Sequence, residues 1–179
     1  MPAIAIRPAQ IQDLNALISI DTAFQTAYVW QMDRIIEKGQ ISIYFREVRL
    51  PRPVKVDYPN PPEKLAVDLG GMEGVLVALL DRQPVGFIQI KEYQSTSTAW
   101  VSNLVISDKV RRQGIGSALV LAGQNWASQH NLRRMVLEMQ SKNYPAIQLA
   151  IKLGYEFSGY NDHYYENRDI ALLFACFIR

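Results

Sequence analysis

The sequence has little cysteine, no marked excess of one charge and no long apolar run. Cys176 is its single cysteine, so no disulfide framework can form within one chain. The formal net charge of +2 argues against a dedicated nucleic-acid binder or a polybasic membrane binder. No apolar run reaches the roughly 18 residues that span a bilayer, and the first residues do not resemble a signal peptide. We therefore expect a cytoplasmic protein that binds neither nucleic acid nor membrane.

The length and composition are those of one globular domain. With 179 residues, of which 49% are hydrophobic and 20% charged, the chain is long enough to bury a substantial core. We find no internal repeat, and we expect a single domain over residues 1–179. No cluster of His, Cys, Asp and Glu has the spacing of metal ligands, so we predict no metal site.

The order of the apolar patterns predicts an α/β fold of the α+β kind, a mixed and mostly antiparallel sheet flanked by helices. We expect strands at 3–7, 28–32, 41–45, 74–80, 85–93, 98–106, 134–139, 155–160 and 169–177, and helices at 10–24, 117–130 and 143–153. A helix at 29–37 is an alternative that periodicity does not exclude. Five prolines in 50–73 predict that most of this segment is an irregular surface excursion.

The most informative segment lies between the predicted strand 98–106 and the predicted helix after it. Its residues are Arg111, Arg112, Gln113, Gly114, Ile115, Gly116 and Ser117. Small residues let backbone N–H groups approach a ligand, and a helix N-terminus adds unpaired N–H groups and partial positive charge. With two arginines beside them, these groups predict an anion cradle suited to a pyrophosphate. Taken alone, the two glycines could also be simple turn chemistry, because the segment is neither a Walker A loop nor a complete dinucleotide fingerprint.

A second motif follows the predicted strand 134–139. It contains Asn143, Ala146, Lys152, Gly154 and Tyr155. Together the two segments resemble the GNAT superfamily of N-acetyltransferases, whose patterns are Arg/Gln-x-x-Gly-x-Gly/Ala and Asn-x-x-Ala-x-x-x-Tyr-x-Lys-x-Gly-Phe. One position departs from the second pattern, because Ala150 stands where the family usually has tyrosine. Residues 83–88, 137–140, 154–160 and 170–174 are most similar to the streptothricin acetyltransferase-like branch.

The resemblance implies acetyl-CoA as the cofactor. It places the pyrophosphate on Arg111 to Ser117 and the pantetheine arm beside Leu104, Val105 and Ile106, whose backbone can pair with amide groups. The N–H of Val105 is our choice for the group that binds the thioester oxygen. Asn143 is expected to contact the cofactor or simply to cap its helix.

The catalytic residues are less well defined by the sequence. Many relatives carry a carboxylate in the strand before the cradle, where this chain has Ser102 and Asn103. The remaining nearby carboxylates are Glu138 and Glu92, which ends the preceding predicted hairpin. We expect Glu138 to act as the base, through water, or else to bind the substrate ammonium or make a structural hydrogen bond. The acid that replaces the absent tyrosine could come from Tyr144, Tyr160, Tyr164 or Tyr165, of which Tyr160 and Tyr165 are our candidates, or the reaction could proceed without a dedicated acid.

The resemblance implies a transferase, an acyltransferase that moves acetyl directly from acetyl-CoA to a primary amine of a small molecule or peptide. Two alternatives stay open, a non-catalytic acyl-CoA-binding sensor and a protein N-terminal or lysine acetyltransferase. A homodimer is compatible with the sequence. The unfamiliar first half of the chain, including 50–73, is expected to form much of the acceptor side.

Overall fold

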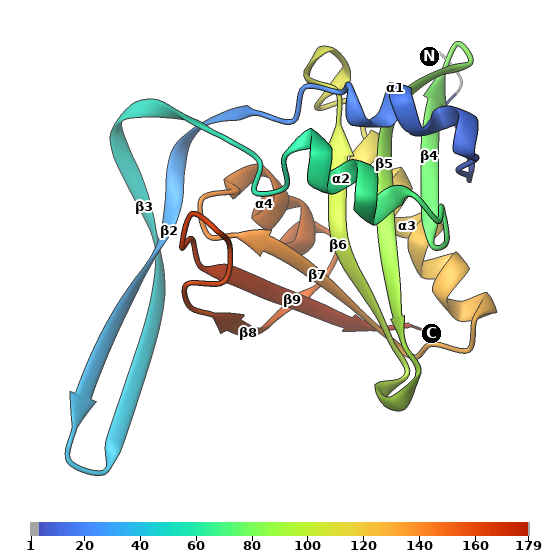
Figure 1. Ribbon diagram of the computed structural model, residues 1–179. Helices are drawn as coiled ribbons and strands as arrows, with labels where there is room; N and C mark the ends of the chain where they lie inside the picture. The colour runs from blue at the N-terminus through green and yellow to red at the C-terminus, as the bar shows by residue number, and fades with distance from the viewer. Residues whose placement is uncertain (1–3, 179) are drawn as a thin grey trace.

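A seven-stranded sheet forms the centre of the computed structural model, which describes residues 4–178 (Figure 1). Its spatial order is β1-β4-β5-β6-β7-β9-β8, and all neighbours are antiparallel except the parallel pair β6–β7. The strands are β1 (Ile4–Pro8), β4 (Val75–Leu80), β5 (Gln83–Tyr93), β6 (Thr98–Ile106), β7 (Arg134–Gln140), β8 (Glu156–Asn161) and β9 (Ala171–Phe177). The predicted mixed, mostly antiparallel sheet is confirmed, while Ala3 at the start of the first predicted strand lies outside the described residues.

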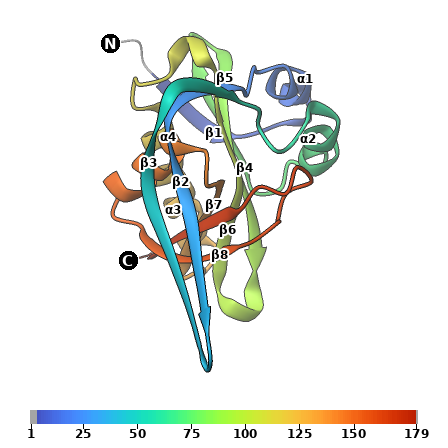
Figure 2. The same ribbon diagram turned by 90° about the vertical axis from the view of Figure 1, so that its left-hand side faces the viewer.

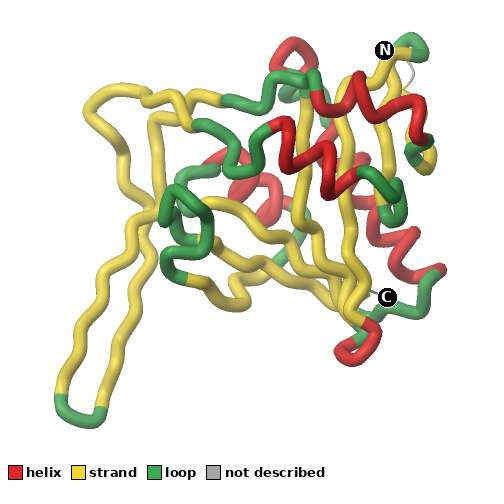
Figure 3. The backbone as a smooth tube through the Cα atoms, viewed as in Figure 1, coloured by secondary structure: helices red, strands yellow, loops and turns green. Residues whose placement is uncertain are grey.

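Helices cover both faces of this sheet (Figures 1 and 3). The short α1 (Leu14–Ile18) and α2 (Pro62–Leu69) pack on one face, and α3 (Ile115–Gln129) and α4 (Tyr144–Lys152) pack on the other. The alternation of β4 shows why both faces need cover. Val75 and Val77 belong to the apolar cluster under α1 and α2, whereas Leu76 and Ala78 belong to the cluster under α3 and α4. In the described part of the chain, no helix is both long and apolar enough to cross a membrane.

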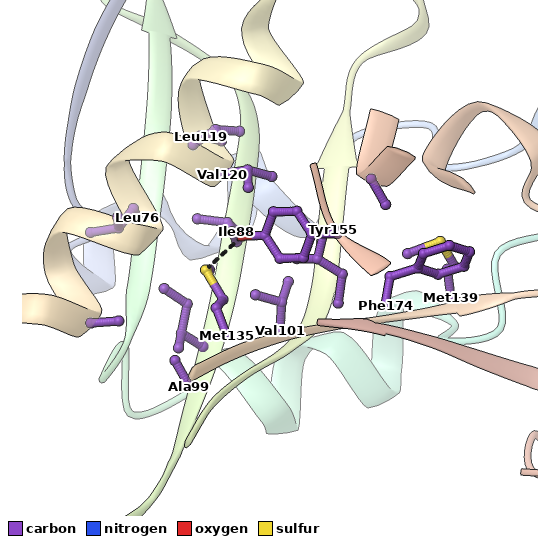
Figure 4. Close-up of a cluster of buried hydrophobic side chains, with 14 of the residues drawn as sticks. Leu76, Ile88, Ala99, Val101, Leu119, Val120, Met135, Met139, Tyr155 and Phe174 are labelled. Carbon is purple, nitrogen blue, oxygen red and sulfur yellow. Dashed lines mark hydrogen bonds between the residues drawn. The ribbon is translucent and has the colours of Figure 1, made fainter. Parts of the chain in front are cut away.

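The larger core lies between α3, α4 and the sheet (Figure 4). Tyr155 crosses it, and its hydroxyl donates to the sulfur of Met135 at 3.2 Å. Gly123 lets α3 lie close to the sheet, because an added Cβ would meet the methyl group of Met135 at 2.9 Å. This close packing fixes α3, and with it the position of the α3 N-terminus.

A long two-stranded ribbon, β2 (Phe24–Glu37) paired with β3 (Gln40–Val56), projects from the body (Figures 1 and 2). The predicted hairpin is therefore confirmed and extended, and the alternative helix at 29–37 is wrong. The predicted helix at 10–24 is also too long. A 3-10 turn at Ile11–Asp13 precedes α1, and the carboxylate of Asp21 accepts the N–H of Ala23 in the turn that starts the ribbon.

The proline-rich segment 50–73 is more regular than its composition predicts. β3 continues to Val56, and α2 follows after a short loop. Pro51 and Pro53 fit in β3 because they lie at a register shift, between the pairs Tyr28–Arg49 and Thr26–Val54. Pro61 and Pro62 lie at the N-terminus of α2, where a missing N–H costs no helical hydrogen bond.

The parallel strands β6 and β7 separate part of the way along their length. They pair over four positions, from Thr98 with Arg134 to Val101 with Leu137. Beyond these pairs the two strands no longer pair with each other. On their far sides, β6 stays paired with β5 and β7 stays paired with β9. The edges that face each other there carry backbone groups that no strand satisfies.

Candidate functional site

A recess opens where β6 and β7 separate, and its cavity volume is about 30 Å³. Its walls come from both strands, from α4, from the loop before α2 and from the segment between β8 and β9. The lining residues are Tyr58, Pro59, Val101, Ser102, Leu104, Leu137, Glu138, Met139, Gln140, Asn143, Ala146, Leu149 and Tyr165. Four of the predicted cofactor-binding and catalytic residues therefore meet here, namely Leu104, Glu138, Asn143 and Tyr165.

Glu138 is the single acidic side chain among the lining residues. One carboxylate oxygen accepts the indole N–H of Trp100 at 2.7 Å and the hydroxyl of Tyr164 at 3.1 Å, and the other accepts the hydroxyl of Tyr165 at 3.2 Å. Within residues 4–178 it forms no ion pair. The recess thus holds a half-buried carboxylate that neutral donors orient and no cation neutralises.

The two tyrosines bound to Glu138 hold their protons firmly. Burial, followed by the nearby charge of Glu138, raises the pKa of Tyr164 to about 12. The same two causes raise the pKa of Tyr165 still further above its ordinary value. At neutral pH both hydroxyls are therefore donors to Glu138, and Tyr165 is a weaker acid than a free phenol.

The structure does not bring Tyr160 to this recess. Its ring packs against Phe45 of the ribbon, with centroids 5.1 Å apart, and it does not line the recess. Ala150 is fully buried in the core behind α4. Its full burial leaves no open space beside it that a replacement hydroxyl could fill.

The backbone of β6 contradicts our choice of Val105 as the thioester donor. The carbonyl of Val105 faces β5, since it would lie 2.7 Å from a Cβ added at Gly86. The N–H and C=O of one strand residue point to the same edge, so Val105 cannot donate into the recess. Leu104, one residue earlier, faces the open edge, and its N–H lies beside the phenol oxygen of Tyr58.

The N-terminus of α3 carries the expected free donors. Gly114 adopts a left-handed φ of +85°, and its carbonyl accepts the first helical hydrogen bond, from Ala118 at 3.0 Å. In the part of the chain that the structure describes, the N–H groups of 114–117 donate to no acceptor. Arg112 beside them is exposed and also has a left-handed φ of +65°. These groups could hold an anion at the end of α3.

Arg111 has a structural role that the sequence does not indicate. Its guanidinium donates to three backbone carbonyls, Ile106 at 2.9 Å, Ala23 at 3.0 Å and Asp21 at 3.3 Å. These bonds tie the cradle to the turn between α1 and β2. Three of the five guanidinium N–H groups are therefore held by backbone carbonyls, and a phosphate contact by Arg111 would use the two that remain.

Gly116 and Asn143 both serve the packing of α4. A Cβ on Gly116 would lie 3.2 Å from a methyl carbon of Leu149, so the glycine lets α3 and α4 approach each other. The side chain of Asn143 caps α4 by accepting the N–H of Ala146 at 3.2 Å. Asn143 also lines the recess, so capping and ligand contact are compatible.

Sequence reasoning missed a buried polar network that carries Tyr58 to the recess. Asn103 accepts from the hydroxyl of Tyr58 at 2.9 Å and from the amide of Asn60 at 2.7 Å, and donates to Gln89 at 2.7 Å. Burial raises the pKa of Tyr58, which stays a donor. The sequence gives no signal for these contacts, because they join residues far apart in the chain.

Two curated relatives match part of the chain. An N-alpha-acetyltransferase from Sulfurisphaera tokodaii is 30% identical over 54% of this chain and 59% of its own length. A streptothricin acetyltransferase from Escherichia coli is 29% identical over 51% of this chain and 52% of its own length. The chain thus matches just over half the length of these two relatives.

Solved structures share the fold over nearly the whole chain. The crystal structure of nourseothricin acetyltransferase is 20% identical, with a TM-score of 0.82 and 99% of both chains covered. A putative streptothricin acetyltransferase from Bacillus anthracis, in complex with acetyl coenzyme A, is 21% identical, with a TM-score of 0.75 and 98% and 99% of the two chains covered. The sequence model of the acetyltransferase (GNAT) family matches residues 42–155, which is more than half of the chain, and the protein therefore belongs to this family.

Proposed function

We propose that the protein, as one GNAT domain over residues 1–179, is an N-acetyltransferase that moves acetyl directly from acetyl-CoA to a primary amine. One observation carries the proposal. The separation of β6 and β7 places the carboxylate of Glu138 opposite the open backbone edge at Leu104, in a single recess. An amine acceptor needs the first group and a thioester carbonyl needs the second.

The residues around the recess fit acetyl-CoA. The free N–H groups at 114–117, with Arg112, would hold the pyrophosphate. The open edges of β6 and β7 can pair with the amide groups of pantetheine, as an added strand would. Asn143, at the start of α4, would lie beside this arm. The cofactor supplies an activated acetyl group as a thioester.

Glu138 would bind the ammonium of the acceptor and take up one of its protons. A primary ammonium has a pKa near 10, so the neutral amine needs a base beside it. As the C–N bond forms, the negative thioester oxygen would take the place of the phenol oxygen of Tyr58 at the N–H of Leu104, which would stabilise it. When the C–S bond breaks, the thiolate leaves with the second amine proton. Tyr165 would orient Glu138 in this scheme, because its raised pKa makes it a poor proton donor to a thiolate.

A small-molecule amine is our first choice of acceptor, and a peptide N-terminus is the second. Similarity to a streptothricin acetyltransferase supports the former, and similarity to an N-alpha-acetyltransferase supports the latter. The carboxylate of Glu138 argues against a CoA-binding sensor, because it is oriented by hydrogen bonds and has no cationic partner, and CoA binding alone does not require such a group. A cytoplasmic location is consistent with a chain that has one cysteine.

A turnover assay with acetyl-CoA tests the proposal. Free thiol release is measured with a panel of amines that includes streptothricin, short peptides and simple alkylamines. We expect at least one amine to accelerate thiol release in the wild type and Glu138→Gln to abolish most of that gain. Tight CoA binding with no turnover of any amine would favour the sensor and refute the enzyme.

A further inference from the structure

Gln140 presents a polar atom that nothing in the described chain satisfies. Its side chain is 1% exposed and lines the recess, and its Oε1 has no hydrogen-bond partner among the described residues. The orientation of the amide is fixed, because Nε2 donates to the carboxylate of Asp169 at 2.9 Å. A carboxylate only accepts, so the amide cannot turn its oxygen toward Asp169. Gln140 therefore keeps a buried acceptor without a donor in the wall of the recess.

An unsatisfied buried acceptor destabilises a protein, so its retention beside a binding recess points to a ligand. Gln140 stands two residues after Glu138 on β7, so both side chains lie on the same face of the strand and both line the recess. Two residues of strand span about 7 Å. A ligand with an amine at Glu138 and a second donor about 7 Å away matches both acceptors.

Asp169 makes this arrangement rigid. Besides Gln140, its carboxylate accepts from Lys142 at 2.5 Å and from Asn167 at 2.9 Å. Its backbone carbonyl accepts the N–H groups of Tyr164 and Tyr165, whose hydroxyls orient Glu138. The same residue thus positions both acceptor groups of the recess.

We propose that Gln140 determines acceptor specificity, by accepting a hydrogen bond from a second N–H or O–H of the amine substrate. The substrate class is then a primary amine that carries a further donor about four carbons away, such as an amino alcohol or a diamine. Asp169 is a positioning residue that turns the oxygen of Gln140 toward this donor. This inference rests on the proposed amine acetylation at Glu138.

An isosteric ligand pair tests the inference without requiring turnover. 4-Aminobutan-1-ol and pentylamine have the same charge and length, and differ in a hydroxyl against a methyl group. Each is titrated calorimetrically into the wild type and into Gln140→Met, with and without saturating CoA. We expect the wild type to bind the amino alcohol about tenfold more tightly and Gln140→Met to lose this preference, because methionine keeps the volume without the amide.

Variants at Asp169 separate orientation from packing. Asp169→Ala removes the acceptor that holds Nε2 of Gln140, so the amide can turn its nitrogen toward the recess and the preference for the amino alcohol should fall. Adding Gln140→Glu should restore the preference, since both carboxylate oxygens accept whichever way the side chain turns. Lys142→Met removes an ion pair from the same carboxylate and is the matched control, with the preference retained.

The outcomes separate this inference from the proposed function. Equal binding of the two ligands to the wild type, binding of neither, or the same preference in Gln140→Met would overturn the role of Gln140. Weaker CoA binding by Gln140→Met with an unchanged preference would also overturn it, because the oxygen would then serve a pantetheine amide. A preference that depends on Gln140, found without acetyl transfer to any amine, would sustain the specificity site and refute the enzyme.

Discussion

Arg111→Ala is expected to weaken the fold more than it weakens CoA binding. In the structure the guanidinium donates to the carbonyls of Ile106, Ala23 and Asp21, at 2.9, 3.0 and 3.3 Å. A hydrogen bond to a charged group contributes about 1.5–3 kcal/mol, but these three share one partly exposed side chain, and the freed carbonyls can bind water. We therefore expect the free energy of unfolding to fall by about 2 kcal/mol.

The same variant leaves the proposed anion cradle intact. The free N–H groups at 114–117 and the exposed Arg112 remain, so CoA affinity should change by less than about threefold. Arg112→Ala is the matched variant. It should lower CoA affinity by about tenfold or more, because a charge-assisted phosphate contact contributes roughly 1.5–3 kcal/mol, while stability hardly changes.

Urea unfolding and calorimetric titration with CoA measure the two effects separately. Arg111→Lys is informative as well, because one ammonium cannot reach three carbonyls and should not restore stability. An Arg111→Ala protein with unchanged stability and tenfold weaker CoA binding would refute the structural role. It would show that the guanidinium turns to the phosphate when the cofactor binds.

Three further predictions concern other parts of the molecule. Glu138→Gln should lower kcat by about 100-fold or more at unchanged CoA affinity, because an amide cannot accept the amine proton. Steady-state kinetics with an active amine measures this, and a retained kcat would contradict the role of Glu138. Arg7 lowers the pKa of Asp13, so this pair stabilises the protein above pH of about 4 and the stability is lost as pH falls through the lowered pKa. Asp13→Asn should reduce the difference between the free energies of unfolding measured in urea at pH 7 and at pH 3. An unaltered difference would refute the contribution of this ion pair. Gly74→Ala should destabilise the protein by more than about 2 kcal/mol in thermal unfolding. The φ of Gly74 is +67°, and the new Cβ would lie 2.0 Å from the carbonyl oxygen of Ile90. A variant with the Tm of the wild type would contradict this backbone geometry.

The elements after residue 74 could be predicted because their signals are local. Periodic apolar runs between turn residues define β4 to β9 and the two long helices, and each run decides its own structure. The first half could not be predicted as well. Whether Pro51 and Pro53 break a strand depends on the register of β3 against β2, which no local window contains.

In the candidate site, too, features with a local sequence signal could be predicted and contacts between distant residues could not. The free donors at the start of α3 follow from a short motif, and Glu138 and Tyr165 were both predicted from the sequence and both lie at the recess. The partners of Arg111 were not predictable, because Ala23 and Asp21 lie 88 and 90 residues away in the chain. Tyr58 reaches the recess through Asn103, 45 residues away, for the same reason.

The four residue pairs that join β6 to β7 also bear on how the molecule unfolds. They are the only strand pairing between the half-sheet β1-β4-β5-β6 and the half-sheet β7-β9-β8 in the described chain. Each half has continuous antiparallel pairing of its own, so the seam between them is the weakest line across the sheet. A ligand in the recess touches both sides of this seam and is excluded from the separated halves. Its binding free energy therefore adds to the cooperativity of unfolding, and the melting temperature should rise with ligand concentration.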